Sequence, residues 1–246
     1  WDMPSIYMQT NAIGTINLFE ALRFLDLKPR ILVSCTPEEF GNVDKKDLPI
    51  TEETRISPLN PYAASKVAQD MVCMTWGESY NFQIIRTRAF NHEGPRRDIL
   101  GANASFANQI AKIEFGLQEP IIEVGDLKAV RNFTDVRDIV IAYHLAIKHC
   151  IPNELYLIGS DNIYSMQECL EYLISLSKVK GITFKTVKER IRPTELYNFV
   201  GDFSKFEKLT SWKPKISFEE TMNSVLNYWR KVIELELKQK LIVTFP

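Results

Sequence analysis

A tyrosine and a lysine, Tyr62 and Lys66, stand four positions apart in the run NPYAASK at residues 60–66. On a helix these two positions share a face, so the lysine ammonium can approach the phenol. A phenol with an ordinary pKa near ~10 is a poor base at neutral pH, but a neighbouring cation favours the phenolate and lowers that pKa. The pair alone is weak evidence, because the same spacing is common on solvated helix faces. Its value as an acid–base site depends on the residues around it.

A hydroxyl side chain, Thr36, supplies part of that context. It follows the apolar run Ile-Leu-Val at residues 31–33, which is typical of a buried strand. Parallel sheets bind ligands at the carboxyl ends of their strands, so Thr36 could hydrogen-bond the substrate oxygen that Tyr62 deprotonates. Taken alone, such residues more often form a polar turn. The interval from Thr36 to the Tyr62 motif makes chance agreement less common.

Hydrophobic spacing predicts the elements that position these residues. Helices are expected near residues 5–25, 61–80 and 105–115 and after Asp135, with strands at 31–33, 83–88 and 121–124 and a loop at 91–101. This alternation predicts an α/β sheet with crossover helices. From about residue 151 the pattern changes to strands at 155–158 and 184–187 and helices at 165–177 and 218–237. Ser165 and Glu168 predict a capping box at the start of the first of these helices.

Composition excludes several classes of protein. The net charge of −1 gives no general attraction to nucleic acid or to an anionic membrane, and the uncharged stretches are too short to span a bilayer. The four cysteines are scattered and form no CxxC pair, so the sequence does not favour a zinc site. Reduced thiols are the simpler interpretation, and they predict a cytoplasmic location. The chain opens at Trp1 almost directly into a helix, so we expect that its native N-terminal segment is missing.

Five motifs in order, TPEEFG, NPYAASK, RTRAFNHEGPRR, RNFTDVRDI and RPTE, resemble those of the extended short-chain dehydrogenases that modify nucleotide sugars. Within that family the chain is most similar to the branch of GDP-mannose 4,6-dehydratases and GDP-4-keto-6-deoxymannose reductases. The resemblance extends to about Arg230 and includes NAIGT at residues 11–15, which matches the NxxGT helix of the family. In that helix Asn11 would help to organise the proton path.

The resemblance implies a Rossmann-like doubly wound parallel sheet, truncated at its N-terminus, with a smaller C-terminal substrate-binding α/β lobe. Residues 1–150 would form the catalytic domain and residues 151–246 most of the second lobe, interleaved with parts of 91–130. The family begins with a strand and a GxxGxxG turn that holds the cofactor pyrophosphate, and no such motif occurs here. Two smaller departures are Phe40, commonly Tyr in the family, and Pro37, which could alter the aim of the flanking side chains.

The family's catalytic roles carry over to four residues. Tyr62 would take the proton from the sugar 4-hydroxyl, Lys66 would hold the nicotinamide ribose and lower the Tyr62 pKa, and Thr36 would orient the 4-oxygen. In the dehydratases a glutamate two residues after that threonine removes the C5 proton before water leaves from C6, and Glu38 occupies this position. A solvent-exposed loop carboxylate is an equally common role for such a glutamate.

The resemblance also implies a cofactor, NADP or NAD, and a GDP-sugar substrate. His92 and Arg97 fall where the dehydratase branch contacts NADP, and Asn91, Arg131 and Arg192 are candidates for binding the GDP-sugar. Each arginine could equally form a surface salt bridge. The helices near residues 5–25 and 61–80 resemble the pair through which family members dimerise, which implies a homodimer or homotetramer.

Three functions remain open from the sequence. The first is a 4,6-dehydratase acting on GDP-mannose, supported by Thr36 and Glu38. The second is a reductase or epimerase of the same family, which would use Tyr62 and Lys66 without Glu38. The third is a non-catalytic remnant that serves as a binding subunit, suggested by the absent glycine turn. A strand followed by GxxGxxG in the upstream genomic sequence would exclude the third.

Overall fold

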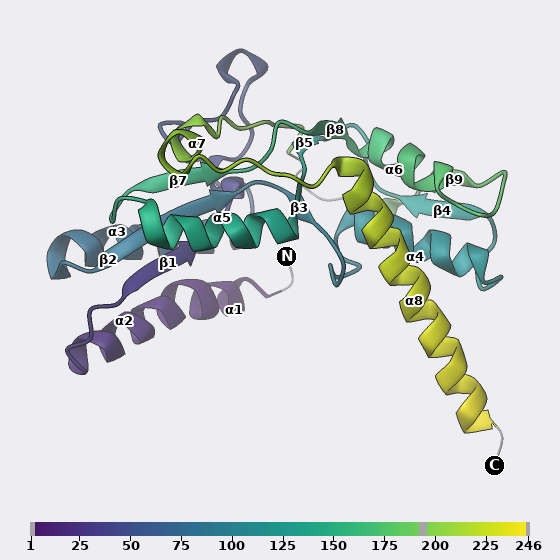
Figure 1. Cartoon of the computed structure of the whole chain (residues 1–246), viewed down its shortest axis with the longest axis horizontal. Coiled ribbons are helices and arrows are strands. Elements are labelled where there is room, and N and C mark those ends of the chain that lie inside the picture. The colour runs from purple at the N-terminus through teal and green to yellow at the C-terminus, as the bar shows by residue number, and fades with distance from the viewer. Residues whose placement is uncertain (1–2, 192–195, 245–246) are drawn as a thin grey trace.

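A parallel sheet of three strands forms the centre of one lobe in the computed structural model, which describes residues 3–191 and 196–244 (Figure 1). The strands, in spatial order, are β1 (Arg30–Ser34), β2 (Gln83–Ala89) and β7 (Leu155–Ile158), and both pairings are parallel. The carboxyl ends of β1 and β2 therefore lie at the same edge of the sheet. This is the edge from which the Thr36 segment leaves.

Helices cover both faces of this sheet. Alternate strand residues point to opposite sides, so Val33 and Ile84 pack with Phe19 on one face, whereas Leu32 and Ile85 pack toward the other. The first face carries α1 (Pro4–Met8), a π-helical segment (Gln9–Ile13), α2 (Gly14–Phe24) and α3 (Pro61–Tyr80). The second face carries α5 (Val136–His149) and α7 (Ser204–Thr210). The predicted Rossmann-like, doubly wound α/β architecture is confirmed.

A second lobe has its own apolar core, in which Phe106, Ile110, Leu170 and Leu226 are buried together. It is built from α4 (Ala102–Glu114), β4 (Ile121–Val124), α6 (Met166–Ser175), β9 (Thr183–Thr186) and α8 (Phe218–Thr244), with β4 and β9 parallel. Helix α8 lies along α4 and then runs away from the body of the molecule (Figure 1). The chain enters this lobe before residue 150 and returns to the first sheet at β7, and the division at residue 150 stays a prediction.

Short strands and turns join the two lobes. One sheet has the order β10 (Asn198–Phe199), β5 (Val130–Asn132) and β8 (Ile163–Ser165), and β3 (His92–Glu93) pairs with β6 (Thr134–Asp135). Three 3₁₀ turns lie at Pro37–Phe40, Lys45–Asp47 and Lys188–Arg190. Within the described part of the chain, no helix has the length and apolar character needed to cross a membrane.

Most predicted elements occur where the sequence places them, and the differences are local. The helix expected over 61–80 has these bounds, and the capping box of Ser165 and Glu168 is present. The helix expected over 5–25 contains a π-helical turn at Gln9–Ile13, and the loop expected over 91–101 contains strand β3. The terminal helix extends beyond residue 237 to Thr244.

Strand β3 carries a buried acid, Glu93, directly after His92. Glu93 is 5% exposed, and burial raises the pKa of its carboxyl group to about 7, although the Arg97 charge lowers it. Strand β3 pairs in parallel with β6, so this acid lies in the segment that fixes the backbone of His92. The protonation of Glu93 therefore affects the stability of that segment.

Replacing Glu93 by glutamine should make the protein less sensitive to pH. The folded pKa of about 7 lies above the ordinary value of 4.5, so the folded chain binds more protons than the unfolded chain between these values. Wild-type stability therefore falls as the pH rises through this window, by on the order of 2 to 3 kcal/mol. Thermal unfolding at pH 5 and pH 8 should show Glu93→Gln gaining on the wild type at pH 8. Glu123→Gln is the control, because Glu123 forms a half-exposed ion pair with Lys185. Parallel curves of stability against pH for Glu93→Gln and wild type would contradict the expectation.

Candidate active site

The start of helix α3 places Tyr62 and Lys66 beside the end of β1. Asn60 caps the helix, since its side-chain oxygen accepts the Ala63 N–H at 2.7 Å. Tyr62 is partly buried in the first turn, and Lys66 follows one turn later on the same face. The Lys66 Nζ donates to the backbone oxygen of Ser34 at 2.9 Å, which ties the helix to the strand end. The sequence-predicted pair is thus directed at the edge where parallel sheets bind ligands.

The segment after β1 is a tight 3₁₀ turn with Thr36 as its N-cap. The Thr36 Oγ1 accepts the Glu38 N–H at 3.3 Å, and the Glu39 carboxylate accepts the Thr36 N–H at 3.1 Å. Pro37 is buried at the first position of the turn, where its fixed φ suits the helical geometry. Gly41 ends the turn with φ +65°, and a Cβ there would collide with the Ser57 carbonyl, so only glycine fits. The loop around Thr36 is therefore fixed by local bonds.

Three of the predicted catalytic side chains meet at this point. The Asn60 Nδ2 donates to the Glu38 carboxylate at 2.8 Å, so the residue that caps α3 also holds Glu38. The Thr36 hydroxyl and the Glu38 carboxylate both affect the pKa of the Tyr62 phenol, so the three side chains lie close together. A phenol, a hydroxyl and a carboxylate are thus placed together by the contact between two segments.

The pKa of the Tyr62 phenol is raised above its ordinary value of 10, which differs from the lowering predicted for a Tyr–Lys pair. Burial is the largest cause, the nearby Glu38 charge adds to it, and the hydrogen bond with Thr36 acts in the opposite direction. The ammonium of Lys66 is bonded to Ser34 and to the Gln69 Oε1, at 2.8 Å, instead of to the phenol. The positive charge expected to favour the phenolate is thus directed elsewhere.

A hydrogen-bonded path connects Asn11 to the helix of Tyr62. Asn11 lies in the π-helical segment, a feature frequent at functional sites, and its Nδ2 donates to the Ser65 Oγ at 2.9 Å. The Ser65 hydroxyl in turn donates to the Tyr62 backbone oxygen at 2.7 Å. A second branch runs from Gln69 to the Thr15 hydroxyl at 2.9 Å, and from there to the Asn11 backbone oxygen at 2.7 Å. Asn11 therefore braces the segment that carries Tyr62 and Lys66.

The predicted cofactor residues lie after β2. The His92 Nδ1 contacts the Phe90 backbone oxygen at 3.0 Å, and burial lowers the pKa of the imidazole, while Arg97 is exposed. Asn91 accepts the Thr134 N–H through its backbone oxygen at 3.0 Å. Across residues 3–191 and 196–244 no hydrogen bond or ion pair links these three side chains to Tyr62. Their cofactor and substrate roles stay predictions.

Two arginines, Arg131 and Arg192, are predicted to bind the substrate. Arg131 is buried, donates to the Leu196 backbone oxygen, and stacks its guanidinium over the Phe199 ring at 5.5 Å from the centroid. Arg192 lies outside the described residues. The Tyr197 hydroxyl, in the segment that follows Arg192, donates to the Asp126 carboxylate at 2.9 Å.

Several residues beneath the site were missed by the sequence interpretation. Glu39, Asp70 and Cys35 place one potential ligand atom each within 4.8 Å of the others, a spacing that suits a metal ion. However, Arg88 lies 2.8 Å from Glu39 and 2.6 Å from Asp70, so a guanidinium already supplies the positive charge there. The available signal was the position of Asp70, one helical turn after Lys66 on the same face.

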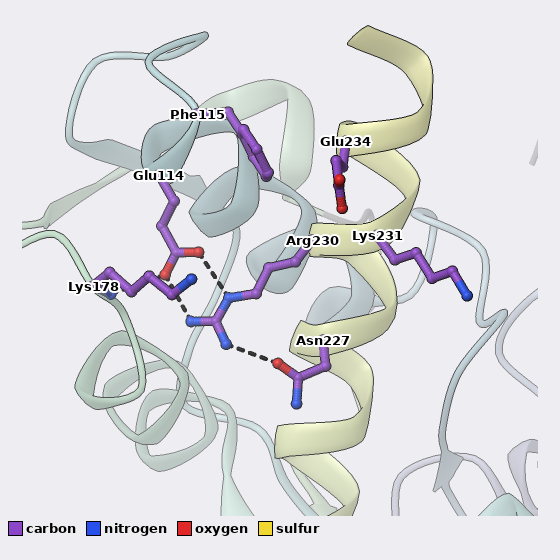
Figure 2. A pocket seen from close by; sticks show the side chains of 7 residues that line it. All are labelled: Glu114, Phe115, Lys178, Asn227, Arg230, Lys231 and Glu234. Atoms are coloured by element: carbon purple, nitrogen blue, oxygen red, sulfur yellow. Dashed lines mark hydrogen bonds and ion pairs between the residues drawn. The ribbon is translucent and has the colours of Figure 1, made fainter. Parts of the chain in front are cut away.

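A cavity of about 400 Å³ lies in the second lobe, away from these residues (Figure 2). Figure 2 shows Arg230 reaching both carboxylate oxygens of Glu114, with Asn227 bonded to the same guanidinium. None of the predicted site residues lines it. Of the charges that face this cavity, Glu114 and Arg230 pair with each other, and Glu234 pairs with Lys238 outside the lining.

Comparison with known proteins gives a consistent family. The model of the family described as GDP-mannose 4,6 dehydratase matches residues 1–225. GDP-6-deoxy-D-mannose reductase of Pseudomonas aeruginosa is 31% identical, over 95% of this chain and 76% of that protein. GDP-mannose 4,6 dehydratase 1 of Arabidopsis thaliana is 27% identical, over 98% of this chain and 66% of that protein. The chain spans about three quarters of the length of the reductase and about two thirds of the length of the dehydratase.

Solved structures agree with the fold. RMD from Pseudomonas aeruginosa, complexed with NADPH, superposes with a TM-score of 0.86 at 31% identity, covering 92% of this chain and 74% of that one. dTDP-glucose 4,6-dehydratase from Bacillus anthracis, in complex with NAD, gives a TM-score of 0.79 at 25% identity, covering 92% and 70%. Both carry a nicotinamide dinucleotide.

The electrostatic link between Glu38 and Tyr62 can be tested without substrate. Because the Glu38 charge raises the pKa of Tyr62, the substitution Glu38→Gln should lower that pKa. The phenolate absorbance of each protein, minus that of the same protein carrying Tyr62→Phe, isolates the Tyr62 titration. Glu53→Gln, at an exposed glutamate on the following loop, should leave the titration unchanged. An unchanged curve in Glu38→Gln would show that the two side chains do not interact.

Proposed function

Since the chain belongs to the GDP-mannose 4,6-dehydratase family, we propose that it converts GDP-mannose to GDP-4-keto-6-deoxymannose by removal of water. The observation that carries this proposal is the placement of Glu38. Asn60 holds its carboxylate at 2.8 Å, close enough to Tyr62 for the Glu38 charge to raise the pKa of the phenol. A dehydratase needs a second base at this position, in addition to the phenol that serves the 4-hydroxyl.

Each side chain has one task in this reaction. Tyr62 takes the proton from the sugar 4-hydroxyl, and Thr36 hydrogen-bonds the same oxygen to orient it. Once C4 is a ketone, the proton on C5 is acidified, and Glu38 is the carboxylate placed to remove it as water leaves from C6. An NADP or NAD molecule, when bound, supplies the hydride chemistry at C4 and C6.

Lys66 fits the ribose end of such a dinucleotide. An ammonium has three N–H donors, and two are directed to Ser34 and Gln69. The third N–H of Lys66 donates to no acceptor among the described residues, so it can donate to a ribose hydroxyl at the end of β1. His92 and Arg97 would complete the cofactor contacts, with Arg97 exposed and able to meet a phosphate by paired hydrogen bonds.

We assign a GDP-sugar as the substrate. The matching family and the two relatives described above are all named for enzymes of GDP-linked mannose derivatives. Asn91, Arg131 and Arg192 would hold it, since arginine suits the recognition of a diphosphate. The Arg131 guanidinium is already stacked on Phe199, which would hold it rigid for this purpose.

A second candidate function is the reduction of a GDP-4-keto-6-deoxymannose. The reductase of Pseudomonas aeruginosa is 31% identical to this chain, compared with 27% for the Arabidopsis dehydratase. A reductase would use Tyr62 as the proton donor to the 4-oxygen and would leave Glu38 without a chemical role. An epimerase of the family would likewise rely on Tyr62 and Lys66.

Incubation of the full-length protein with GDP-mannose and NADP⁺ separates the two functions. The proposal expects a 4-keto-6-deoxy product, and expects Glu38→Gln to lower the turnover by about a hundredfold, because the base for the C5 proton is lost. Glu53→Gln is the control and should keep wild-type turnover. Undiminished product formation in Glu38→Gln would remove this glutamate from its role. Consumption of NADPH with the keto sugar, without turnover of GDP-mannose, would establish the reductase.

We further propose a cytoplasmic homodimer or homotetramer. All four cysteines are buried and unpaired, as expected in a reducing compartment. Helices α1, α2 and α3 and the π-helical segment expose large apolar side chains that a second copy would cover; they include Ile6, Ile13, Leu18, Phe24 and Met74. Large exposed apolar side chains on neighbouring helices are the kind of surface that a protein–protein interface covers.

Substitution of Leu18 tests this interface. Its side chain is 54% exposed on α2, and Leu18→Glu places a charge that desolvation would penalise in a dimer. Light scattering coupled to gel filtration should show a dimer or tetramer for wild type and a smaller species for Leu18→Glu. Leu100→Glu, at an 86% exposed leucine in the loop after β3, should keep the wild-type mass. A monomeric wild type would disprove the proposed assembly.

A further inference from the structure

Glu39 is a fully buried carboxylate that the proposed reaction does not use. It follows Glu38 in the turn after β1, yet its side chain is 0% exposed, whereas Glu38 is partly open to solvent. Burying a charge is costly unless the charge is paired and hydrogen-bonded. A residue of this kind therefore points to a specific structural task close to the reacting groups.

This carboxylate belongs to one buried network with two arginines of β2 and an aspartate of α3. The Arg88 guanidinium lies 2.8 Å from Glu39 and 2.6 Å from Asp70. Arg86 approaches the other oxygen of Asp70 at 3.0 Å. The Arg88 guanidinium also stacks over the Phe40 ring, 4.5 Å from its centroid. All four charged side chains are at most 11% exposed, so water does not screen their interaction.

The network joins the two segments that carry the reacting groups. One oxygen of Glu39 accepts the Thr36 N–H at 3.1 Å, and the other faces Arg88. Asp70 lies on α3 two helical turns after Tyr62 and on the same face. A continuous set of contacts therefore runs from the Thr36 backbone through Glu39, Arg88 and Asp70 to the helix of the phenol.

We propose that Glu39 is a positioning residue for the reaction, which holds the Thr36 hydroxyl against the Tyr62 phenol by anchoring the Thr36 turn to Arg88 and Asp70. This inference rests on the proposed function, in which Thr36 and Tyr62 act on the same sugar oxygen. Small displacements of such groups lower turnover strongly, by about a hundredfold for a shift near 1 Å.

The anchor depends on the ionised form of Glu39, which adds a pH dependence. Burial raises its pKa to about 7, and the Arg88 charge opposes that rise. The ion pair is therefore formed above pH 7 and lost as the pH falls below it. The titratable and charged groups around Glu39 on the three packed segments are Cys35, Glu38, Tyr62, Asp70, Cys73, Arg86 and Arg88.

Two substitutions of Glu39 test the role with the full-length protein and GDP-mannose. Glu39→Gln keeps an acceptor for the Thr36 N–H and removes the charge, and Glu39→Leu removes both without leaving Arg88 unpaired, because Asp70 remains. We expect kcat to fall by about tenfold in Glu39→Gln and about a hundredfold in Glu39→Leu, with KM within about twofold. The inflection of kcat near pH 7 should be absent from both variants.

Glu114→Gln is the matched control. Glu114 is a carboxylate 5% exposed and paired with Arg230 at 2.7 Å, so its loss destabilises the fold in the same way, in the other lobe. It should lower the unfolding temperature and keep the wild-type kcat and pH profile. A folded Glu39→Leu with wild-type kcat and pH profile would overturn the inference and leave the proposed function intact.

Hydrogen–deuterium exchange separates a failure of the inference from a failure of the proposed function. If the wild type converts neither GDP-mannose nor the keto sugar, the proposed function is wrong, and the peptide spanning residues 34–41 then decides the inference. At least about tenfold faster exchange of this peptide in Glu39→Leu, with the rest unchanged, supports the anchor. Unchanged exchange overturns it. In Glu114→Gln, faster exchange is expected only in α4, in α8 and at Ser177 and Lys178, which bond the same carboxylate.

Discussion

The candidate site depends on a single side-chain amide, that of Asn60, which joins a helix to a loop. Its oxygen accepts the Ala63 N–H and so fixes where α3 begins, while its nitrogen donates to Glu38. Tyr62 is two residues further on, so the cap that starts the helix also sets the position of the phenol. A helix start leaves backbone donors without partners unless a side chain caps it. Here the same cap supplies a second bond that aims a carboxylate.

The electrostatics of the site oppose release of the phenol proton. Burial and two neighbouring glutamates, Glu38 and Glu39, raise the pKa of Tyr62, and the hydrogen bond with Thr36 opposes them less strongly. A phenol in such surroundings needs a compensating positive charge to lose its proton near neutral pH. Lys66, held by two acceptors one turn along the helix, and an oxidised nicotinamide are the sources that the family's chemistry offers. The pair at 62 and 66 is therefore one part of a balance of charges.

Local signals in the sequence predicted the elements with strong caps and periodicity. Helix α3 has Asn60 and Pro61 at its start and a left-handed Asn81 at its end, and it was placed with its observed bounds. Five strands are only two or three residues long: β3, β5, β6, β8 and β10. They form by pairing with segments distant in the sequence, and they are too short to show a periodic hydrophobic pattern that would predict them.

Buried charges were equally invisible in the sequence. Glu39, Asp70 and Arg88 resemble ordinary solvated residues, because charged side chains are rarely buried, and only their mutual distances reveal the network. The four catalytic candidates were found because each belongs to a motif with a fixed order along the chain. The supporting residues belong to no such motif, and the pairing between β1 and β2 brings them together.

Glu38 separates the two chemistries of the family on physical grounds. Its charge raises the pKa of the phenol, which opposes proton removal by Tyr62 and keeps the phenol protonated. A reductase, in which Tyr62 donates a proton, has no step for Glu38, whereas the proposed dehydration uses it as the base for the C5 proton. The identities of 31% and 27% to a reductase and a dehydratase do not decide between these activities. The bond from Asn60 to Glu38 holds a carboxylate close to Tyr62, and the proposed dehydration assigns it the role of the second base.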